Sequence, residues 1–279
     1  TSGFNSVSDN YVLSTLNRAN DWWLNKESNT IFNAPYEKVI SKFRNYFAKQ
    51  DIEQMNMLDT IIALKHLVSV FEIKDLNNLK QTIRWLKDDY FPSKQPGDMD
   101  IANVRKLKGM IRESEADRLL SLKNVQQQNI SHLRSKFYTS KEFPKIPRLE
   151  ADVLPFLKLF NTYKPDILTV DDDPQSAPPV THYKVMQIIA QALRNKDAVL
   201  SGNLMIWGYR NVWFRYRVQD ANMFVPVSES MLEAQRRAYL NCFNTQKSAT
   251  FPSPFFEGDF SELTAKIQKE QLADLKLLL

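Results

Sequence analysis

The feature that most constrains the fold is a helical spacing of apolar residues through most of residues 10–122. In PYEKVISKFRNYFAKQ, Val39, Phe43 and Phe47 recur at this spacing, and Pro35 stands where a first helical turn favours proline. The segments IEQMNMLDTIIALKHLVSVFEI, DLNNLKQTIRWLKDDYF and MDIANVRKLKGMIRESEADRLLSLK repeat the pattern without a fixed period, which argues against a solenoid. We therefore expect this part to be almost wholly helical.

The following part alternates between strand and helix patterns. NISHL and DILTV are short strand candidates, THYKVMQIIAQALR is an amphipathic helix, and LMIWGYRNVWFRYRVQDANMFVPVS predicts two or three strands. Two helices follow, and the second has Asp259 as its N-cap with Glu262 three residues later, a capping-box arrangement. This alternation predicts an α/β sheet on which the helical first part packs as an insertion.

Composition excludes several classes of protein. Of 279 residues, 43% are hydrophobic and 25% charged, and 37 basic against 32 acidic residues give a net charge of +5 with both signs interleaved, so we expect no nucleic-acid partner. No apolar run approaches the ~20 residues of a membrane span, so no membrane association is expected. The single cysteine, Cys242, excludes a disulfide framework and a cysteine-based zinc site, and fits a reducing, cytoplasmic compartment.

The stretch DDDPQSAPPVTHYKV holds the clearest candidate for a metal site. His182 is either a metal ligand or a histidine that caps or faces solvent at a helix start, and the second interpretation is favoured. Asp171, Asp172 and Asp173 offer oxygen ligands to a hard cation, but acid runs in loops are usually solvated. Cys242 is expected to be a small buried residue and not a nucleophile, since no histidine is near it in sequence.

The aromatic segment YRNVWFRY raises a second alternative. Arg210, Arg215 and Trp213 are candidates to line a sugar cleft, because aromatic faces suit pyranose rings. Trp207, Trp213 and Phe214 equally fit the core face of alternating strands, and we expect at least two of the three to be buried.

Five segments together carry a resemblance to a known family. TSGFNSVSD, VRKLKGMIRESEADRLL, NISHLRSKFYT, YKPDILTVDDDPQSAPPVTHYKV and WGYRNVWFRYRVQDANMFVPVS occur in the order found in LmbE/PIG-L-type de-N-acetylases. The chain most resembles the version fused behind a glucosamine-6-phosphate deaminase domain. The resemblance implies one Rossmann-like domain over residues 1–279, with a helical insertion at 25–95. It also implies an attached deaminase-like domain as partner and an amino-sugar ligand.

The resemblance suggests residues near a sugar site. Thr1 and Gly3 match a family turn at the mouth of the active site, and Gln246 matches a glutamine of a His-x-x-Gln arrangement. Arg112 and Glu115 match a family arginine and glutamate, where a guanidinium can fork onto a phosphate or a hydroxyl pair. An ordinary ion pair on a helix surface explains the last two residues equally well.

The resemblance also shows departures at the zinc site. His182 matches the third zinc ligand, but Ala177 and Pro179 stand where the family has aspartate and histidine, and Phe243 replaces a later histidine. The family's His-Pro-Asp-Asp segment, with two further ligands and the catalytic base, is expected upstream of Thr1. A zinc deacetylase needs three ligands and an open position for water, so we expect no zinc and no deacetylation in this chain alone.

Two hypotheses follow. The chain is a degenerate, non-catalytic sugar-binding or regulatory module, or it is part of a zinc-dependent de-N-acetylase whose other ligands lie upstream. Without the upstream strands the sheet would be short, with an exposed hydrophobic edge or a homo-oligomer that covers it.

Overall fold

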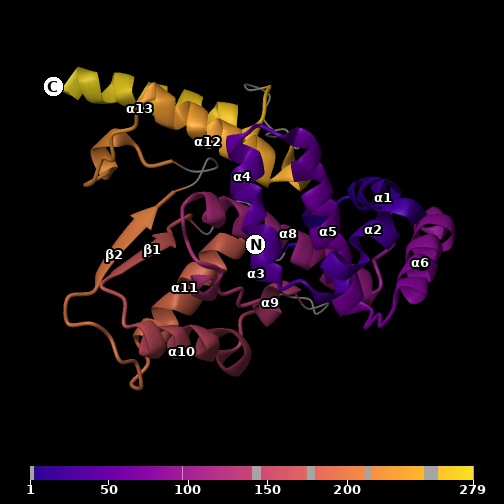
Figure 1. The fold of residues 1–279 in the computed structure, drawn as a ribbon. Coiled ribbons are helices and arrows are strands. Elements are labelled where there is room, and N and C mark those ends of the chain that lie inside the picture. The colour runs from indigo at the N-terminus through magenta and orange to yellow at the C-terminus, as the bar shows by residue number, and fades with distance from the viewer. Residues whose placement is uncertain are drawn as a thin grey trace. The chain divides into compact units, whose positions relative to one another are not determined.

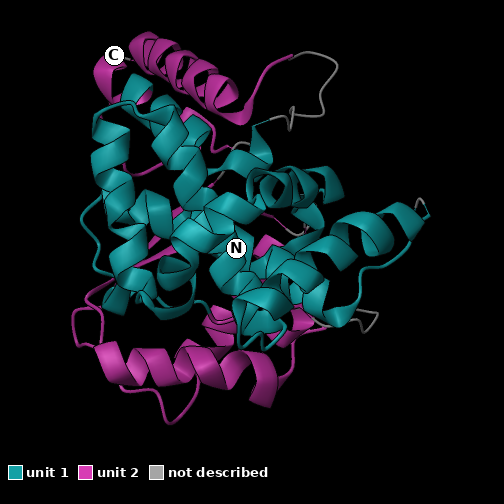
Figure 2. Ribbon diagram, turned by 45° about the vertical axis from the view of Figure 1, so that its right-hand side comes forward, with its two compact units in different colours: residues 1–132, 233–249 teal, residues 133–232, 250–279 magenta. Residues whose placement is uncertain are grey.

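The computed structural model describes residues 3–95, 97–139, 146–174, 180–210, 215–247 and 257–278. The chain forms two compact units, shown in Figure 2. Unit 1 contains residues 1–132 and 233–249, and unit 2 contains residues 133–232 and 250–279. The assignment of the whole chain to one family-like domain stays a prediction.

All regular secondary structure in the described residues of unit 1 is helical. Its helices are α1 (Asp9–Arg18), α2 (Asp21–Asn33), α3 (Tyr36–Ile40), α4 (Lys42–Ala48), α5 (Ile52–Val70), α6 (Leu76–Arg84), the π-helical η2 (Trp85–Tyr90), α7 (Phe91–Ser93), α8 (Ala102–Leu122) and most of α12 (Glu229–Cys242). The short helical turns are η1 (Phe4–Ser6), η3 (Gln127–Asn129) and η6 (Asn244–Gln246). The helical prediction for residues 10–122 is confirmed, whereas the status of 25–95 as an insertion stays a prediction.

Side-chain caps fix where these helices begin. Ser8, Asn20, Asp51 and Asp75 each accept a hydrogen bond from the backbone N–H three residues later. Such a cap satisfies one of the N–H groups that the first helical turn leaves without a partner.

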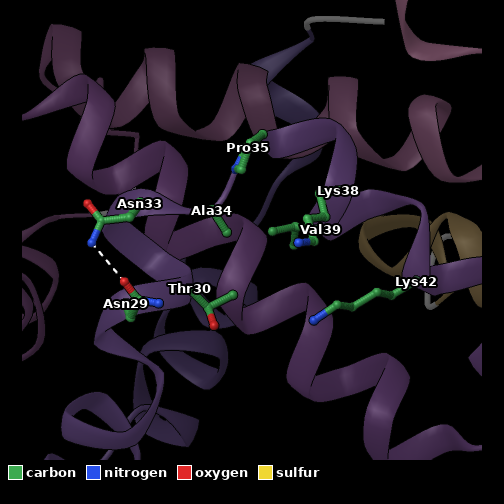
Figure 3. A pocket seen from close by; sticks show the side chains of 8 residues that line it. All are labelled: Asn29, Thr30, Asn33, Ala34, Pro35, Lys38, Val39 and Lys42. Atoms are coloured by element: carbon green, nitrogen blue, oxygen red, sulfur yellow. Dashed lines mark hydrogen bonds between the residues drawn. The ribbon is translucent and has the colours of Figure 1, made fainter.

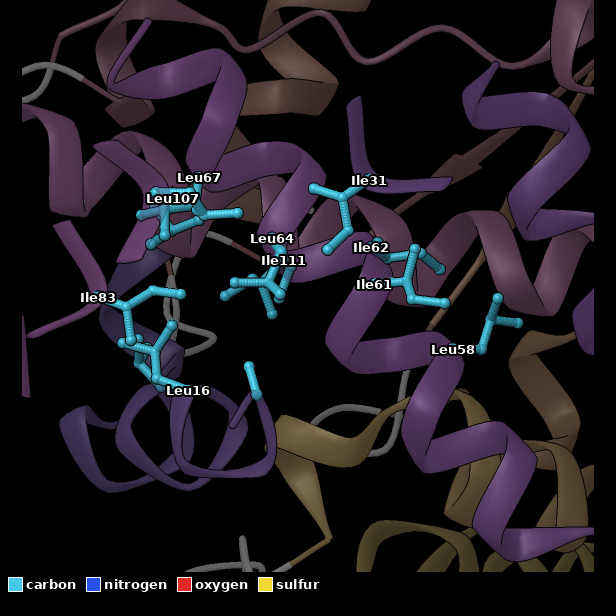
Figure 4. Close-up of a cluster of buried hydrophobic side chains, with 14 of the residues drawn as sticks. Leu16, Ile31, Leu58, Ile61, Ile62, Leu64, Leu67, Ile83, Leu107 and Ile111 are labelled. Carbon is cyan, nitrogen blue, oxygen red and sulfur yellow. The ribbon is translucent and has the colours of Figure 1, made fainter. Parts of the chain in front are cut away.

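The core of unit 1 forms around α5, which is apolar on nearly every side. Leu64 and Leu67 of this helix are fully buried. Figure 4 shows them with residues of α1, α2, α6 and α8, among them Leu16, Ile31 and Ile83. An apolar helix of this kind lies inside a helical layer, so α5 is the element around which the other helices pack.

Unit 2 contains a small parallel sheet. Its elements are α9 (Lys136–Thr139), the π-helical η4 (Leu149–Val153), α10 (Leu154–Tyr163), β1 (Ile167–Asp171), α11 (Thr181–Leu193), β2 (Met205–Tyr209), η5 (Val218–Asp220) and α13 (Phe260–Leu278). The two strands are parallel, with Ile167 opposite Met205 and Asp171 opposite Tyr209. They lie side by side in Figure 1, and α11 connects them in sequence, so the unit contains a β-α-β element.

A separate core supports this sheet. Phe160 of α10 and Ile188 and Ala192 of α11 are buried in one cluster with Phe137 and Val153. The α/β class is therefore confirmed as a helix-rich chain with a two-stranded parallel sheet. The expected helix at 181–194 and its buried face are confirmed as well.

Two expectations for this region were wrong. NISHL forms no strand; a 3-10 turn ends at Asn129, and His132 instead contacts Asp117 of α8. After β2 no strand occurs in the described residues 215–228, because these side chains are mostly exposed and pair with no neighbouring strand. Trp207 is 38% exposed and is not a core residue, but Trp213 and Phe214 lie outside the described residues, so the expectation that two of the three are buried stays a prediction.

No helix in the described part of the chain is both long and apolar enough to cross a membrane.

Candidate functional site

The site is built where the two parallel strands of unit 2 end. β1 ends at Asp171 and β2 at Tyr209, which are register partners. The chain turns sharply after β1: the Asp172 N–H donates to the Tyr209 carbonyl at 2.8 Å, and the Asp173 N–H donates to Asp171 Oδ1 at 3.2 Å. The carboxyl ends of parallel strands are the usual place for ligands in α/β proteins.

Two carboxylates converge on one imidazole nitrogen at this place. Nδ1 of His182, in the first turn of α11, lies 3.2 Å from Asp171 Oδ2 and 3.0 Å from Asp173 Oδ2. The side chain of Asp173 is 1% exposed, that of Asp171 is 19% and that of His182 is 35%. The expectation that these acids are solvated was wrong for Asp173, because the turn after β1 carries its side chain inward to α11.

These three side chains fit a divalent metal ion. One ligand atom from each of Asp171, Asp173 and His182 lies within 4.8 Å of the others. Imidazole nitrogen and carboxylate oxygen bind zinc at about 2.0–2.2 Å, so neighbouring ligands of a tetrahedral ion lie roughly 3.3 Å apart. The separations of 3.0 and 3.2 Å are close to that value.

A second set of contacts fixes the neighbouring loop. The Tyr216 hydroxyl donates to Asp172 Oδ2, and Arg210 Nε donates to the Asp172 carbonyl at 3.3 Å. The Arg210 guanidinium lies 4.3 Å from the centre of the Tyr216 ring. A Cβ at Gly208 would lie 3.3 Å from Asp172 Cβ and 3.4 Å from the Tyr216 hydroxyl, so glycine allows this close approach.

The two tyrosines respond electrostatically to the acids. Burial, followed by the charges of Asp171 and Asp173, raises the pKa of Tyr209. Burial and then the hydrogen bond to Asp172 raise the pKa of Tyr216. Both phenols therefore stay protonated at neutral pH, and Tyr216 keeps the O–H that positions Asp172.

Three other candidates meet in a network of unit 1. Arg112 pairs with Glu115 and donates from Nη1 to Thr245 Oγ1 at 3.0 Å. Glu115 also accepts from the Thr245 N–H at 2.6 Å and hydroxyl at 2.8 Å. Gln246 Nε2 donates to Thr245 Oγ1 at 3.0 Å and to the Ser6 carbonyl at 3.1 Å. The sequence resemblance thus grouped residues that are joined in the structure.

The network also serves the fold of unit 1. Glu115 is fully buried, and both of its oxygens accept hydrogen bonds inside the unit. Burial, partly offset first by Arg112, raises the pKa of Glu115. The substrate-binding roles of Arg112, Glu115 and Gln246 stay predictions, as does that of Arg210 in unit 2.

The remaining candidates lie at the beginning of the chain and in the loop before α11. Gly3 precedes η1, and its carbonyl accepts from the Ser6 N–H at 3.1 Å. Thr1, Ala177 and Pro179 lie outside the described residues.

Sequence reasoning missed how Asp171 and Asp173 meet His182. The available signal was their spacing: residues two apart at a strand end, followed by a helix with a histidine in its first turn. Nothing in the sequence pattern pointed to Tyr216 or Gly208.

Comparisons with known proteins give one informative relative. No family model matches the chain, and no solved structure matches it. A curated protein of Bacteroides thetaiotaomicron, named as glucosamine-6-phosphate deaminase-like, is 29% identical over 165 residues. The match covers 58% of this chain and 25% of the relative, so it spans a quarter of that protein's length.

Proposed function

We propose that this chain is a metal-binding, sugar-recognising module of an amino-sugar-processing protein, without deacetylase activity of its own. The observation that carries the proposal is the convergence of Asp171 and Asp173 on Nδ1 of His182 at the end of β1. This proposal replaces the expectation from the sequence that the chain alone holds no zinc. The deaminase-like name of the relative supports amino sugars as the ligand class. The finer part of the proposal is an LmbE/PIG-L-like fold, reduced to a short sheet.

Each residue of the strand-end site has a definite role in this proposal. Asp171, Asp173 and His182 hold a divalent ion, with zinc first because nitrogen and oxygen ligands suit it. When bound there, zinc supplies acidification of a water molecule and polarisation of a carbonyl oxygen. Tyr216 holds Asp172 in place, and Arg210 offers a guanidinium next to the site for an anionic or hydroxyl group of a sugar.

The lack of deacetylase activity is inferred from the sequence. Ala177 and Pro179 replace an aspartate and a histidine of the resembling family, and Phe243 replaces a later histidine. An alanine, a proline and a phenylalanine can neither take a proton from water nor stabilise an oxyanion through a side-chain donor. Loss of these groups leaves recognition, without turnover, as the remaining function.

A second candidate function is a zinc-dependent de-N-acetylase of N-acetylglucosamine-type substrates. It is favoured by the same three-ligand geometry, because catalytic zinc sites in proteins have three protein ligands and water at a fourth position. In this case the catalytic base would come from another part of the longer protein.

Metal content and turnover separate these candidates. Purified protein dialysed against zinc should retain one ion, and Asp173→Asn and His182→Ala should each weaken zinc binding about 100-fold or more. His132→Ala is the matched control, since His132 belongs to unit 1. Absence of zinc binding by the unmodified protein would overturn the proposal. Release of acetate from N-acetylglucosamine 6-phosphate by the longer protein, lost in His182→Ala, would establish the second candidate instead.

A further inference from the structure

A pocket of about 360 Å³ lies in unit 1, outside the residues used so far. It is formed by the end of α2, the short connection to α3, and the first residue of α4 (Figure 3). Its polar lining consists of Asn29, Thr30, Asn33, Lys38 and Lys42. The hollow is open to solvent, because the side chains of Asn29, Asn33, Lys38 and Lys42 are exposed.

The hollow arises because Pro35 interrupts the helical path between α2 and α3. Ala34 is extended, with ψ of 133°, as is usual for a residue before proline, and α2 therefore ends at Asn33. Pro35 then begins α3 in a new direction, and Val39 of that helix is buried against the core. Both α2 and α3 pack on α5, which holds the two walls of the hollow in place.

A lysine from α5 stabilises one wall. Lys65 Nζ donates to the carbonyls of Thr30 and Ile31, at 3.3 and 2.8 Å. These carbonyls belong to the last turn of α2, where the helix dipole is negative, and the ammonium offsets that charge.

The lining has an excess of positive charge and of hydrogen-bond donors. No carboxylate lines the pocket, and neither Lys38 nor Lys42 makes an ion pair with any residue in the described ranges. Asn33 Nδ2 donates to Asn29 Oδ1 at 2.8 Å, drawn as a dashed line in Figure 3. That bond leaves the Asn29 amide N–H groups and the Asn33 carbonyl oxygen for a ligand.

We propose that this pocket binds a small phosphorylated sugar or a similar anionic polyol. Lys38 of α3 and Lys42, the first residue of α4, both line the pocket and each supply a positive charge for a phosphate group. The carboxamides of Asn29 and Asn33 and the hydroxyl of Thr30 supply the mixed donors and acceptors that sugar hydroxyls need. The proposal concerns unit 1 and is independent of the metal site in unit 2.

The test is isothermal titration calorimetry of the full chain with glucose 6-phosphate, with inorganic phosphate and with glucose, which measures the affinity for each. Glucose 6-phosphate should bind best, inorganic phosphate more weakly, and glucose weakest of all. Lys38→Gln with Lys42→Gln should weaken binding about fivefold or more for each lysine removed. The double variant Lys49→Gln with Lys74→Gln removes two exposed lysines of unit 1 outside the pocket, and should bind as the unmodified protein does.

A second variant tests the pocket without removing a lysine. Asn29→Asp keeps the size of the side chain and an oxygen for Asn33, but places a negative charge in the lining. Binding of glucose 6-phosphate should fall about fivefold or more. Unchanged affinity in this variant, equal loss in the Lys49/Lys74 control, or no saturable binding at millimolar glucose 6-phosphate would each overturn the proposal. Zinc binding, measured on the same variants, should stay unchanged.

Discussion

Buried carboxylates occur in both units, but they meet different partners. In unit 1, Asp59 pairs with the fully buried Arg118, whose Nη2 also donates to the Cys242 carbonyl at 2.8 Å. In unit 2, Asp171 and Asp173 meet at the imidazole nitrogen of His182. The first arrangement contains a guanidinium that is always charged; the second contains a group that can be neutral, protonated or bound to metal.

A second cluster of unit 1 makes the contrast sharper. Lys94 and Lys108 each contact both Asp9 and Asp100 at 2.5 to 2.7 Å, so two ammonium groups neutralise two carboxylates. Permanent cations of this kind complete the charge balance within the fold. The carboxylate oxygens and the imidazole nitrogen of the strand-end site can instead bind a metal cation, which is why we assign metal binding to this site of unit 2 and a stabilising role to the two ion-pair clusters of unit 1.

The largest effect is expected from removing Arg118, the permanently charged partner of the buried Asp59 in unit 1. Arg118→Met should lower the free energy of unfolding by about 3–5 kcal/mol, because the Asp59 carboxylate stays buried without its partner. Urea denaturation measures this. Adding Asp59→Asn removes the stranded charge, so the double variant should lose less than Arg118→Met alone. Arg44→Met, at an exposed position, should stay within about 0.5 kcal/mol of the unmodified protein. A loss below roughly 1 kcal/mol in Arg118→Met would break the comparison.

The second test adds zinc, the cation that we propose the strand-end site of unit 2 binds. Zinc at a hundred times its dissociation constant should raise the free energy of unfolding by about 2.7 kcal/mol, because it binds the folded state. Asp171→Asn with Asp173→Asn should abolish this gain while changing the stability of the metal-free protein much less than Arg118→Met does. Equal zinc stabilisation of the double variant would contradict the assignment of these ligands.

The smallest effect is expected at Asp100. Burial alone would raise the pKa of Asp100, but the hydrogen bonds and charges of Lys108 and Lys94 outweigh it and lower the pKa below 3.8. As the pH falls, the Asp100 carboxylate is therefore protonated in the unfolded chain before it is protonated in the folded chain. The stability that Asp100 contributes is thus present above pH 3.8 and is lost as the pH falls through its folded pKa.

Asp100→Asn should therefore be about 1 kcal/mol less stable at neutral pH, and the difference should shrink as the solution becomes acidic. Urea denaturation across the acid range measures it. Asp89→Asn removes an exposed carboxylate and serves as control. A difference that grows in acid would reverse the sign we assign.

Local signals made the helices predictable. Apolar spacing located the long helices, and Asp259 Oδ1 accepts from the Glu262 N–H at 2.9 Å, as expected for an N-cap. Cys242 is buried as predicted, and burial raises the pKa of its thiol to about 12. These features depend on residues a few positions apart, or on the apolar character of one side chain.

Features that depend on distant partners were not predictable. NISHL has a strand-like composition, but a strand needs a neighbour, and residue 132 instead contacts Asp117. The burial of Asp173 depends on the turn after β1 and on α11, neither of which is visible in a run of three acids. Residue type alone therefore identified some residues of the strand-end site, including Arg210. It did not predict how these residues are arranged in space.

The discontinuity of unit 1 has a consequence for synthesis on the ribosome. The carbonyl that Arg118 contacts lies 124 residues later in the chain, and the Thr245 groups that Glu115 contacts lie 130 residues later. While the intervening residues are translated, the nascent helices carry these charged side chains with their late partners still missing. Unit 1 can then complete its packing only after residue 245 has left the exit tunnel, which makes its co-translational folding wait for most of unit 2.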